Sequence, residues 1–270
     1  MRYAIERRHA ADQLKRIQAM LVQAEKMAAV GQLASGIAHE VKNPLNIILQ
    51  CVSYLEPELT ARGGEQAEVL QVMREAVTTA DDIIKGLLDF SRPSPLQLKP
   101  TAMRPVIETA LLVVERQIAT NKIRLTTDLP ATLPAVMADE NQMKQVFLNV
   151  LMNAIQAMPN GGELRIRASV LKLTEPGQGV GLRQTDVFRP GTTALVCDVQ
   201  DSGPGIPQEL LPKAFIPFFT TKPPGEGVGL GLSICHTILE GHRGLIRLAS
   251  EEGHGTTVTI MLPVPETNGA

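Results

Sequence analysis

The first third of the chain carries a helical pattern of apolar positions. Spacings of three and four residues run from about residue 10 to 60, which predicts one long helix. Its stripe around the middle consists of Leu33, Ile37, Val41, Pro44, Ile48, Val52 and Leu55. After a turn at 60–64, a second stripe consists of Leu70, Met73, Val77, Ala80, Ile84 and Leu87. Since one helical hairpin buries too little apolar surface, two copies are expected to pair as a four-helix bundle, which makes the protein an obligate homodimer.

The apolar pattern continues toward the N-terminus in a looser form. The repeating positions are Leu14, Ile17, Leu21, Ala24, Ala28 and Gly31. A heptad spacing of this kind is typical of a coiled coil, although the side chains near Ala28 and Gly31 are small. Residues 1–30 are therefore expected to be either a signalling helix that conducts a conformational change or a plain dimerisation stalk.

The period of the pattern changes after about residue 101. A linker from Phe90 to Pro100 comes first, and strands are expected over 122–128, 134–138, 163–171, 193–200, 244–249 and 256–263. Leu164, Ile166 and Ala168 alternate with polar residues, as in a half-buried strand. Helical patterns between the strands predict an α/β two-layer sandwich with its helices on one face.

These segments predict an α+β chain of three parts. They are an N-terminal helix over 1–30, a dimeric helical hairpin over 31–95 and a two-layer domain over 96–270. A stretch with several Gly and Pro residues at 172–192 is expected to be a long hairpin loop between two strands.

Composition limits the number of domains, the binding partners and the cellular compartment that can be expected. A length of 270 residues fits two ordinary domains, and a net charge of −2 gives no indication of nucleic-acid binding. The scattered cysteines Cys51, Cys197 and Cys235 fit buried, reduced thiols in the cytoplasm. No apolar run is long enough to span a membrane and no signal peptide is visible, so a membrane link is expected only through a missing N-terminal region.

One histidine stands out on the first helix. His39 lies nearly opposite the apolar stripe, so it is expected to be exposed, with Glu40 beside it and Asn43 one turn later. Pro44 cannot donate to the carbonyl of Glu40, which predicts a kink and a departure of Asn43 from helical geometry. An exposed imidazole beside a carboxylate suits a nucleophile with its base, while an ordinary surface histidine remains open. A His-Glu-x-x-His zinc site is disfavoured because Asn43 occupies its second position.

Two glycine-rich segments in the second half are of the kind that approaches phosphate. Asp201, Gly203 and Gly205 follow a strand. Four further glycines alternate before a helix, and they are Gly225, Gly227, Gly229 and Gly231. Glycine at a helix start lets phosphate oxygens reach backbone N–H groups. Each segment alone is a weak signal, and no P-loop motif is present.

The helix predicted at 140–158 carries a stripe of amides. The stripe consists of Gln142, Gln145, Asn149, Asn153 and Gln156. A solvent-facing stripe normally carries Lys and Glu, whereas amides ligate Mg²⁺ and bond phosphates without adding charge. The stripe therefore favours a metal and phosphate site over an ordinary polar face.

Taken in order, these segments resemble the motifs of two-component sensor histidine kinases. The matching segments are 31–46, 149–154, 201–206, 215–222, 227–231 and 253–256. The resemblance spans about residues 26–263 and implies a dimerisation and phosphotransfer hairpin followed by a Bergerat-type ATP-binding domain. The His-Glu-x-x-Asn-Pro segment is similar to that of the nitrogen-regulation subgroup.

The resemblance implies roles for the histidine segment. His39 would attack the γ-phosphate of ATP, Glu40 would take or orient the ring proton, and Asn43 would orient water to dephosphorylate a partner regulator. The implied function is autophosphorylation of His39 and transfer of the phosphoryl group to an Asp in the receiver domain of a separate response regulator. The rivals are an ATPase of the same fold and a catalytically silent, nucleotide-regulated dimeric scaffold.

The resemblance also implies a nucleotide site. Asn153 and Asn149 would hold Mg²⁺, and Asp201 would accept from the adenine amine. The other implied nucleotide-binding residues are Gly203, Gly205, Lys222, Gly227, Gly229, Gly231 and Thr256, with Thr256 supporting Asp201. A lid at about 207–228 would be docked by Phe218 and Phe219. Related ATPases carry a water-activating Glu at the position of Asn149, so an amide there fits storage of phosphate on His39.

Overall fold

The computed structural model describes residues 41, 43–57, 65–91, 95–173, 188, 191–222 and 229–265. They fall into two compact units, Met1–Ser94 with Lys222–Val228, and Pro95–Thr221 with Gly229–Ala270. The predictions for the N-terminal helix, His39, Glu40 and Gly227 lie outside the described residues. Within the described part of the chain, no helix combines the length and apolar character that crossing a membrane requires.

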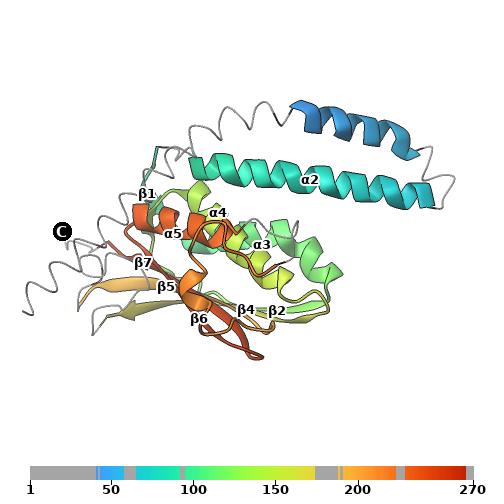
Figure 1. Ribbon diagram of the computed structural model, residues 1–270. Coiled ribbons are helices and arrows are strands. Elements are labelled where there is room, and N and C mark those ends of the chain that lie inside the picture. Colours follow the sequence, from blue (N-terminus) through green and yellow to red (C-terminus); the bar gives the residue numbers. More distant parts are fainter. Residues whose placement is uncertain are drawn as a thin grey trace, which may run out of the picture. The chain divides into compact units, whose positions relative to one another are not determined.

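The first unit contains the expected pair of helices. Residues 43–57 are helical, and α2 spans Glu65–Ser91 beside them (Figure 1). An ion pair joins Glu56 of the first helix to Arg74 of α2. Val52, Leu70 and Val77 are buried, as the two stripes predict. The hairpin is therefore held by an apolar seam with an ion pair at its edge.

The region around Pro44 differs from its prediction. Asn43 and Pro44 are both helical, so the expected departure of Asn43 from helical geometry is wrong. The steric bias against helix before proline is a preference, and proline inside a continuing helix is its recognised exception. Asn43 is exposed on this helix.

The second unit is a two-layer sandwich. Its mixed sheet has the order β2-β4-β5-β7-β6, and only β2 and β4 run parallel. The strands are β2 (Ile123–Asp128), β4 (Gly162–Lys172), β5 (Thr193–Asp201), β6 (Leu245–Glu251) and β7 (Gly255–Pro263). The helices α3 (Met103–Thr120), α4 (Glu140–Gln156) and α5 (Gly231–Gly241) cover one face (Figure 1). The predicted sandwich is confirmed.

A second, small sheet was only half predicted. It pairs β1 (Lys99–Thr101) with β3 (Val136–Ala138) in antiparallel register. The strand β3 lies where it was expected, whereas Lys99 and Pro100 were assigned to a linker. Three residues that include a proline are too few to show an alternating pattern of apolar and polar positions. The strand β1 forms because its backbone can pair with β3. The Thr101 hydroxyl strengthens the pairing by donating to the carbonyl of Ala138 over 2.9 Å.

The main core lies between the sheet and its helices. Leu164, Ile166 and Ala168 are buried, as their alternation predicts. A smaller apolar cluster joins Phe188 to Leu173, Ala194 and Met261, and Phe188 comes from the 172–192 insertion. The ends of that insertion continue the antiparallel pairing of β4 and β5, as a hairpin connection should.

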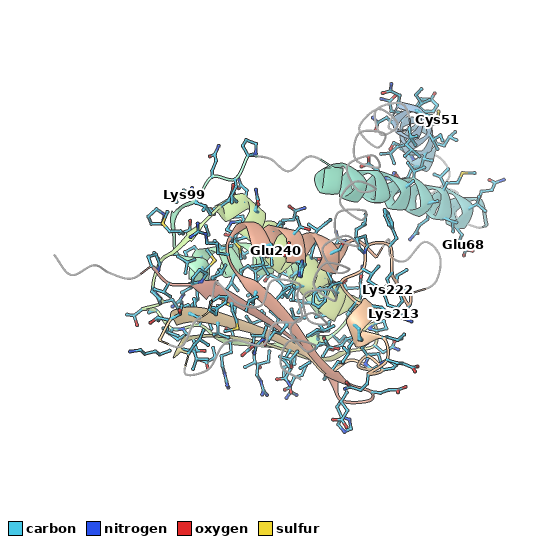
Figure 2. The ribbon with its side chains drawn as sticks, turned by 60° about the vertical axis from the view of Figure 1, so that its left-hand side comes forward. Cys51, Glu68, Lys99, Lys213, Lys222 and Glu240 are labelled. Atoms are coloured by element: carbon cyan, nitrogen blue, oxygen red, sulfur yellow. The ribbon has the colours of Figure 1, made fainter. Side chains whose placement is uncertain are left out.

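The cysteines only partly follow their prediction. Cys197 and Cys235 are buried, but Cys51 is exposed on the helix of residues 43–57 (Figure 2). Cys51 lies outside the buried seam of the hairpin, so the expectation of three buried thiols is wrong at this position.

Candidate functional site

The helix α4 supplies the amide side chains of the site. Its start is capped by Asp139, whose carboxylate accepts from the backbone N–H groups of Asn141 and Gln142 at 3.0 and 3.2 Å. The buried face of α4 consists of Met143, Val146, Phe147, Val150, Leu151, Ala154 and Ile155. Asn149 and Asn153 lie half-buried on a different face. The predicted separation of amide and apolar faces is confirmed.

Asn149 and Asn153 face the start of α5. The Nδ2 of Asn149 donates to the carbonyl oxygen of Gly231 over 3.4 Å. A Cβ atom at Gly231 would lie 3.6 Å from the Nδ2 of Asn153 and 3.9 Å from the Cβ of Asn149. Among the described residues, no side chain caps this helix start, where Leu230 is the N-cap residue. The first N–H groups of α5 can therefore bind an anion beside the two amides.

Asp201 forms a second part of the site at the end of β5. Its side chain is buried, and its Oδ1 accepts from the backbone N–H groups of Gly203 and Thr256 at 2.9 and 3.3 Å. Burial raises the pKa of Asp201, although these two hydrogen bonds act to lower it. Both bonds end on Oδ1, which leaves Oδ2 to accept from a ligand.

The glycines after Asp201 let the chain pass through narrow spaces. A Cβ atom at Gly203 would lie 2.9 Å from the Oδ1 of Asp201 and 3.0 Å from the Cβ of Ala157, just past the end of α4. Gly205 has a φ of +73°, and a Cβ there would lie 2.1 Å from the carbonyl oxygen of Glu251. Side chains at either position would displace the loop that follows Asp201.

Two supporting residues, Ser250 and Gly255, were given no role in the sequence prediction, although Gly255 lies in the matching segment 253–256. The Ser250 hydroxyl accepts from the N–H of Ile206 at 2.7 Å and donates to the carbonyl of Gly255 at 2.8 Å. A Cβ at Gly255 would lie 2.0 Å from the carbonyl oxygen of Asp201. The Gly253-x-Gly255-Thr256 segment could have indicated Gly255, but a single serine in a strand carries no signal.

Thr256 supports Asp201 in a specific way. The two residues are register partners on β7 and β5, and the bond to the carboxylate comes from the backbone N–H of Thr256. The Thr256 hydroxyl lies 2.9 Å from the hydroxyl of Ser250 instead. The predicted support is therefore a property of the strand pairing and does not use the Thr256 side chain.

In the described part of the segment after Gly205, an aromatic ring lies against α5. It contains the short 3₁₀ helix η1 (Leu211–Lys213; Lys213 is labelled in Figure 2). The ring of Phe215 lies 5.8 Å from that of His236 on α5, at an interplanar angle of 53°. Phe218, which was expected to dock the segment, has a half-exposed side chain. Its contribution comes from its backbone N–H, which donates to the carbonyl of Gly229 over 2.9 Å.

Most of the predicted nucleotide-binding residues come together in the second unit. One group is Asn149, Asn153 and Gly231, and the other is Asp201, Gly203, Gly205 and Thr256. Gly229 lies one residue before the N-cap of α5. A Cβ atom added at Gly229 would lie 2.4 Å from the carbonyl oxygen of Phe219. Asn43 and Lys222 are grouped with the other unit.

The chemistry of the site suits a ligand with a hydrogen-bond donor at one end and negative charge at the other. The buried Asp201 carboxylate accepts a hydrogen bond, whereas the uncapped start of α5 attracts negative charge. Within the described residues, no group of three His, Cys, Asp or Glu side chains is placed to hold a metal ion. A hard cation here would take oxygen from the amides of Asn149 and Asn153 and the rest from the ligand and water.

Comparison with known proteins matches two parts of the chain to two domain families. Residues 29–95 match the His Kinase A (phospho-acceptor) domain. Residues 138–266 match the histidine kinase-, DNA gyrase B- and HSP90-like ATPase domain. The sensor histidine kinase ZraS of Escherichia coli K12 is 36% identical over 263 residues, covering 97% of this chain and 50% of ZraS. The chain thus spans about half the length of the curated relatives it matches.

Solved structures show the same architecture. The histidine kinase ThkA in complex with the response regulator TrrA has a TM-score of 0.60 and 25% identity, covering 91% of this chain and 65% of that one. Full-length ShkA in complex with AMPPNP has a TM-score of 0.64 and 22% identity, covering 86% of this chain and 45% of that one. At 22% identity, the likeness to ShkA concerns the fold alone.

Proposed function

Because the chain belongs to the sensor histidine kinases of two-component signalling, we propose that it phosphorylates His39 from ATP and passes the phosphoryl group to a response regulator. The observation that carries this proposal is the meeting of Asn149 and Asn153 with the uncapped start of α5. That arrangement would hold phosphates and a cation, and Asn149 puts an amide where related ATPases carry a water-activating Glu. It therefore favours transfer of the phosphoryl group over hydrolysis.

Adenine would be recognised by Asp201. The Oδ2 of its carboxylate accepts from the exocyclic amine of the base, while Oδ1 stays bonded to the N–H groups of Gly203 and Thr256. Guanine carries a carbonyl at that ring position, and its oxygen would face the carboxylate without a shared proton. Gly203 and Gly205 keep the wall beside the base free of side chains.

The phosphates would lie at the start of α5. The backbone N–H groups there would bind the anion, and Gly227, Gly229 and Gly231 would line the phosphates without side chains. Asn153 and Asn149 would hold Mg²⁺ through their amide oxygens, and Lys222 is the candidate for an added positive charge. Mg²⁺ neutralises phosphate charge and commonly takes most of its ligands from phosphates and water, which fits a site with few protein donors.

The chemical step would belong to the histidine segment. A ring nitrogen of neutral His39 forms a bond to the γ-phosphorus while the bond from that phosphorus to the departing ADP oxygen breaks. Glu40 accepts the proton that the imidazole ring loses, or holds the ring in the reactive tautomer. The phosphoryl group then moves from His39 to a carboxylate oxygen of an aspartate of the response regulator as the bond from phosphorus to the ring nitrogen breaks. The imidazole takes back the proton held by Glu40 and is neutral again.

The partners follow from the first unit. Ile48, Leu55 and Met73 belong to the predicted apolar stripes yet remain 45%, 42% and 51% exposed. A second copy of the hairpin would cover them in a four-helix bundle. The complex of the related ThkA with TrrA supports a response regulator as the second partner. Asn43 would orient water that dephosphorylates this regulator.

One labelling experiment tests the proposal against its rivals. The chain is incubated with γ-labelled ATP and Mg²⁺, and the wild type is compared with His39→Gln. Acid-labile label on the wild type alone is the expected result. Free phosphate without labelled protein would assign the chain to the ATPases of this fold. Neither product would indicate a nucleotide-regulated scaffold.

A further inference from the structure

An aromatic pair joins the segment after η1 to α5. The ring centroids of Phe215 and His236 lie 5.8 Å apart at an interplanar angle of 53°, within the range that favourable aromatic pairs occupy. Both residues are half-buried, and the Nδ1 of His236 lies 3.8 Å from the Oε2 of Glu240, one turn later on α5 (Glu240 is labelled in Figure 2). Since His236 comes five residues after Gly231, Phe215 contacts α5 beyond its first turn.

The same segment contacts the residues before α5 through its backbone. The N–H of Phe218 donates to the carbonyl oxygen of Gly229 over 2.9 Å, at the point where a Cβ on Gly229 would collide with Phe219. Phe218 has a φ of +65°, which a bulky residue keeps only where its surroundings enforce it. Gly229 directly precedes the N-cap residue Leu230, so this backbone contact fixes the approach to α5.

A tight turn connects the ring contact to the backbone contact. The N–H of Phe219 donates to the carbonyl oxygen of Ile216 over 3.2 Å. Only two residues separate Phe215 from Phe218, so a displacement of the ring would also displace the backbone contact. Segment 215–219 therefore holds α5 both on its side and just before its start.

We propose that His236 is a positioning residue for the phosphates of the nucleotide. By holding the ring of Phe215, it keeps segment 215–219 against Gly229 and so fixes the backbone N–H groups at the start of α5, ready to bind an anion. Without the ring contact, Phe218 can leave its left-handed conformation, and the carbonyl of Gly229 then loses its donor. The inference rests on the proposed function, because it concerns the phosphates of ATP.

The test compares a ligand that carries phosphates with one that does not. The whole chain is titrated calorimetrically with a non-hydrolysable ATP analogue and Mg²⁺, and separately with adenosine. His236→Ala should weaken binding of the analogue by about two- to tenfold, the range expected for loss of one aromatic pair. The same variant should bind adenosine like the wild type, since Asp201 is held by Gly203 and Thr256 and not by segment 215–219.

Further variants identify the contact that matters. His236→Phe keeps an aromatic ring at the same place and should restore the affinity for the analogue. Phe215→Leu should weaken that affinity as much as His236→Ala does, and the double variant no further, because the two side chains act through one contact. Thr237→Ala changes an exposed neighbour on α5 and should bind both ligands like the wild type. If His236→Ala melts below the assay temperature, His236→Leu takes its place, because leucine fills the space without a ring.

The outcomes separate this inference from the function on which it rests. Equal weakening of both ligands by His236→Ala would make the residue a general support of the domain and overturn the inference. Unchanged binding of the ATP analogue, or losses that add up in the double variant, would overturn it as well. The kinase function is judged separately by the acid-labile label: a labelled wild type leaves that function standing in each of these cases, and an unlabelled wild type rejects it.

Discussion

At the scale of single residues, the site relies on backbone groups to hold its side chains. Asp201 is fixed by N–H groups of Gly203 and Thr256, and Asn149 by the carbonyl oxygen of Gly231. A side-chain change at Thr256 leaves its N–H in place, whereas a change at Asp201 removes the acceptor itself. A substitution of Asp201 is therefore the one that tests how the site binds the base.

Asp201→Asn should weaken nucleotide binding by about tenfold or more, because a hydrogen bond to a charged acceptor contributes about 1.5–3 kcal/mol. The new amide nitrogen would also face the amine of adenine, donor against donor. Binding of a fluorescent ATP analogue measures the loss. An unchanged affinity would remove Asp201 from the base-binding site.

The same variant makes a prediction about stability and pH. Burial raises the pKa of Asp201 above its ordinary value of 3.8, so the folded protein keeps this proton to a higher pH than the unfolded chain. The wild type therefore loses stability as the pH rises from 3.8 through the raised pKa. Asparagine has no proton to lose, so the free energy of unfolding of the variant relative to wild type should increase over that interval. Urea unfolding at several pH values measures this difference in free energy of unfolding. A difference that does not change with pH would contradict the prediction.

At the scale of helices and strands, α5 is joined to α4 at each of its own two ends. At the start of α5, Gly231 accepts from Asn149 in the middle of α4, and past its end the Nε2 of His242 accepts from the N–H of Asp139 over 2.9 Å. The Nδ1 of buried His242 lies 2.7 Å from the carbonyl oxygen of Ile238. These two contacts assign the tautomer, since Nε2 accepts and Nδ1 must then donate.

His242→Ala should lower the free energy of unfolding by about 2–4 kcal/mol. The substitution leaves the N–H of Asp139 without its acceptor and opens a cavity beneath the end of α5. Urea unfolding of the whole chain measures the change. His254→Ala is the matched control, because His254 is exposed in the turn between β6 and β7 and should change the value by less than about 0.5 kcal/mol. Equal losses of free energy of unfolding in the two variants would argue against a stabilising contact between His242 and Asp139.

The same scale shows what can be predicted from sequence. Strands with an alternating buried face, such as β4 around Ile166, were found because the signal lies in their own residues. The strand β1 was missed because its existence depends on β3, and Ser250 was missed because its role depends on Ile206 and Gly255 from other segments. The glycine segments were recognised as motifs. The structure shows why glycine is required there: backbone from distant parts of the sequence comes too close for a side chain, as Glu251 does at Gly205.

At the scale of the whole molecule, the hairpin carries more apolar surface than it covers by itself. Val72 and Met73 of α2 are 63% and 51% exposed, although they neighbour the buried Leu70 and Val77. Contiguous apolar residues on one helix face mark an interaction surface, and the proposed occupant is a second copy of the hairpin.

Met73→Glu should therefore weaken the homodimer by at least tenfold, because it places a charge in the apolar seam between the copies. Sedimentation equilibrium measures the dissociation constant. Thr78→Glu adds the same charge at an exposed position away from the stripe and should leave the dimer unchanged. A monomeric wild type, or equal dimer constants for both variants, would contradict the proposed bundle.

Asn43 links the hairpin to the second activity proposed for the protein. It is exposed on a continuous helix, immediately before Pro44, so its amide is free to meet a docked regulator and a water molecule. Asn43→Ala should slow dephosphorylation of the regulator by about tenfold or more while autophosphorylation changes little, since a group that orients water acts only in the hydrolytic step. Both rates are measured with the same preparation of phosphorylated regulator and labelled ATP.

The control for this prediction is Gln50→Ala, which removes another exposed amide seven residues along the same helix and should alter neither rate. Seven residues are about two turns, so Gln50 lies on nearly the same side of the helix as Asn43 but away from the histidine segment. Loss of autophosphorylation with unaltered dephosphorylation in Asn43→Ala would assign Asn43 to the kinase step instead. Equal slowing by both variants would point to docking of the regulator along the helix, because only a general contact would be shared by two amides so far apart.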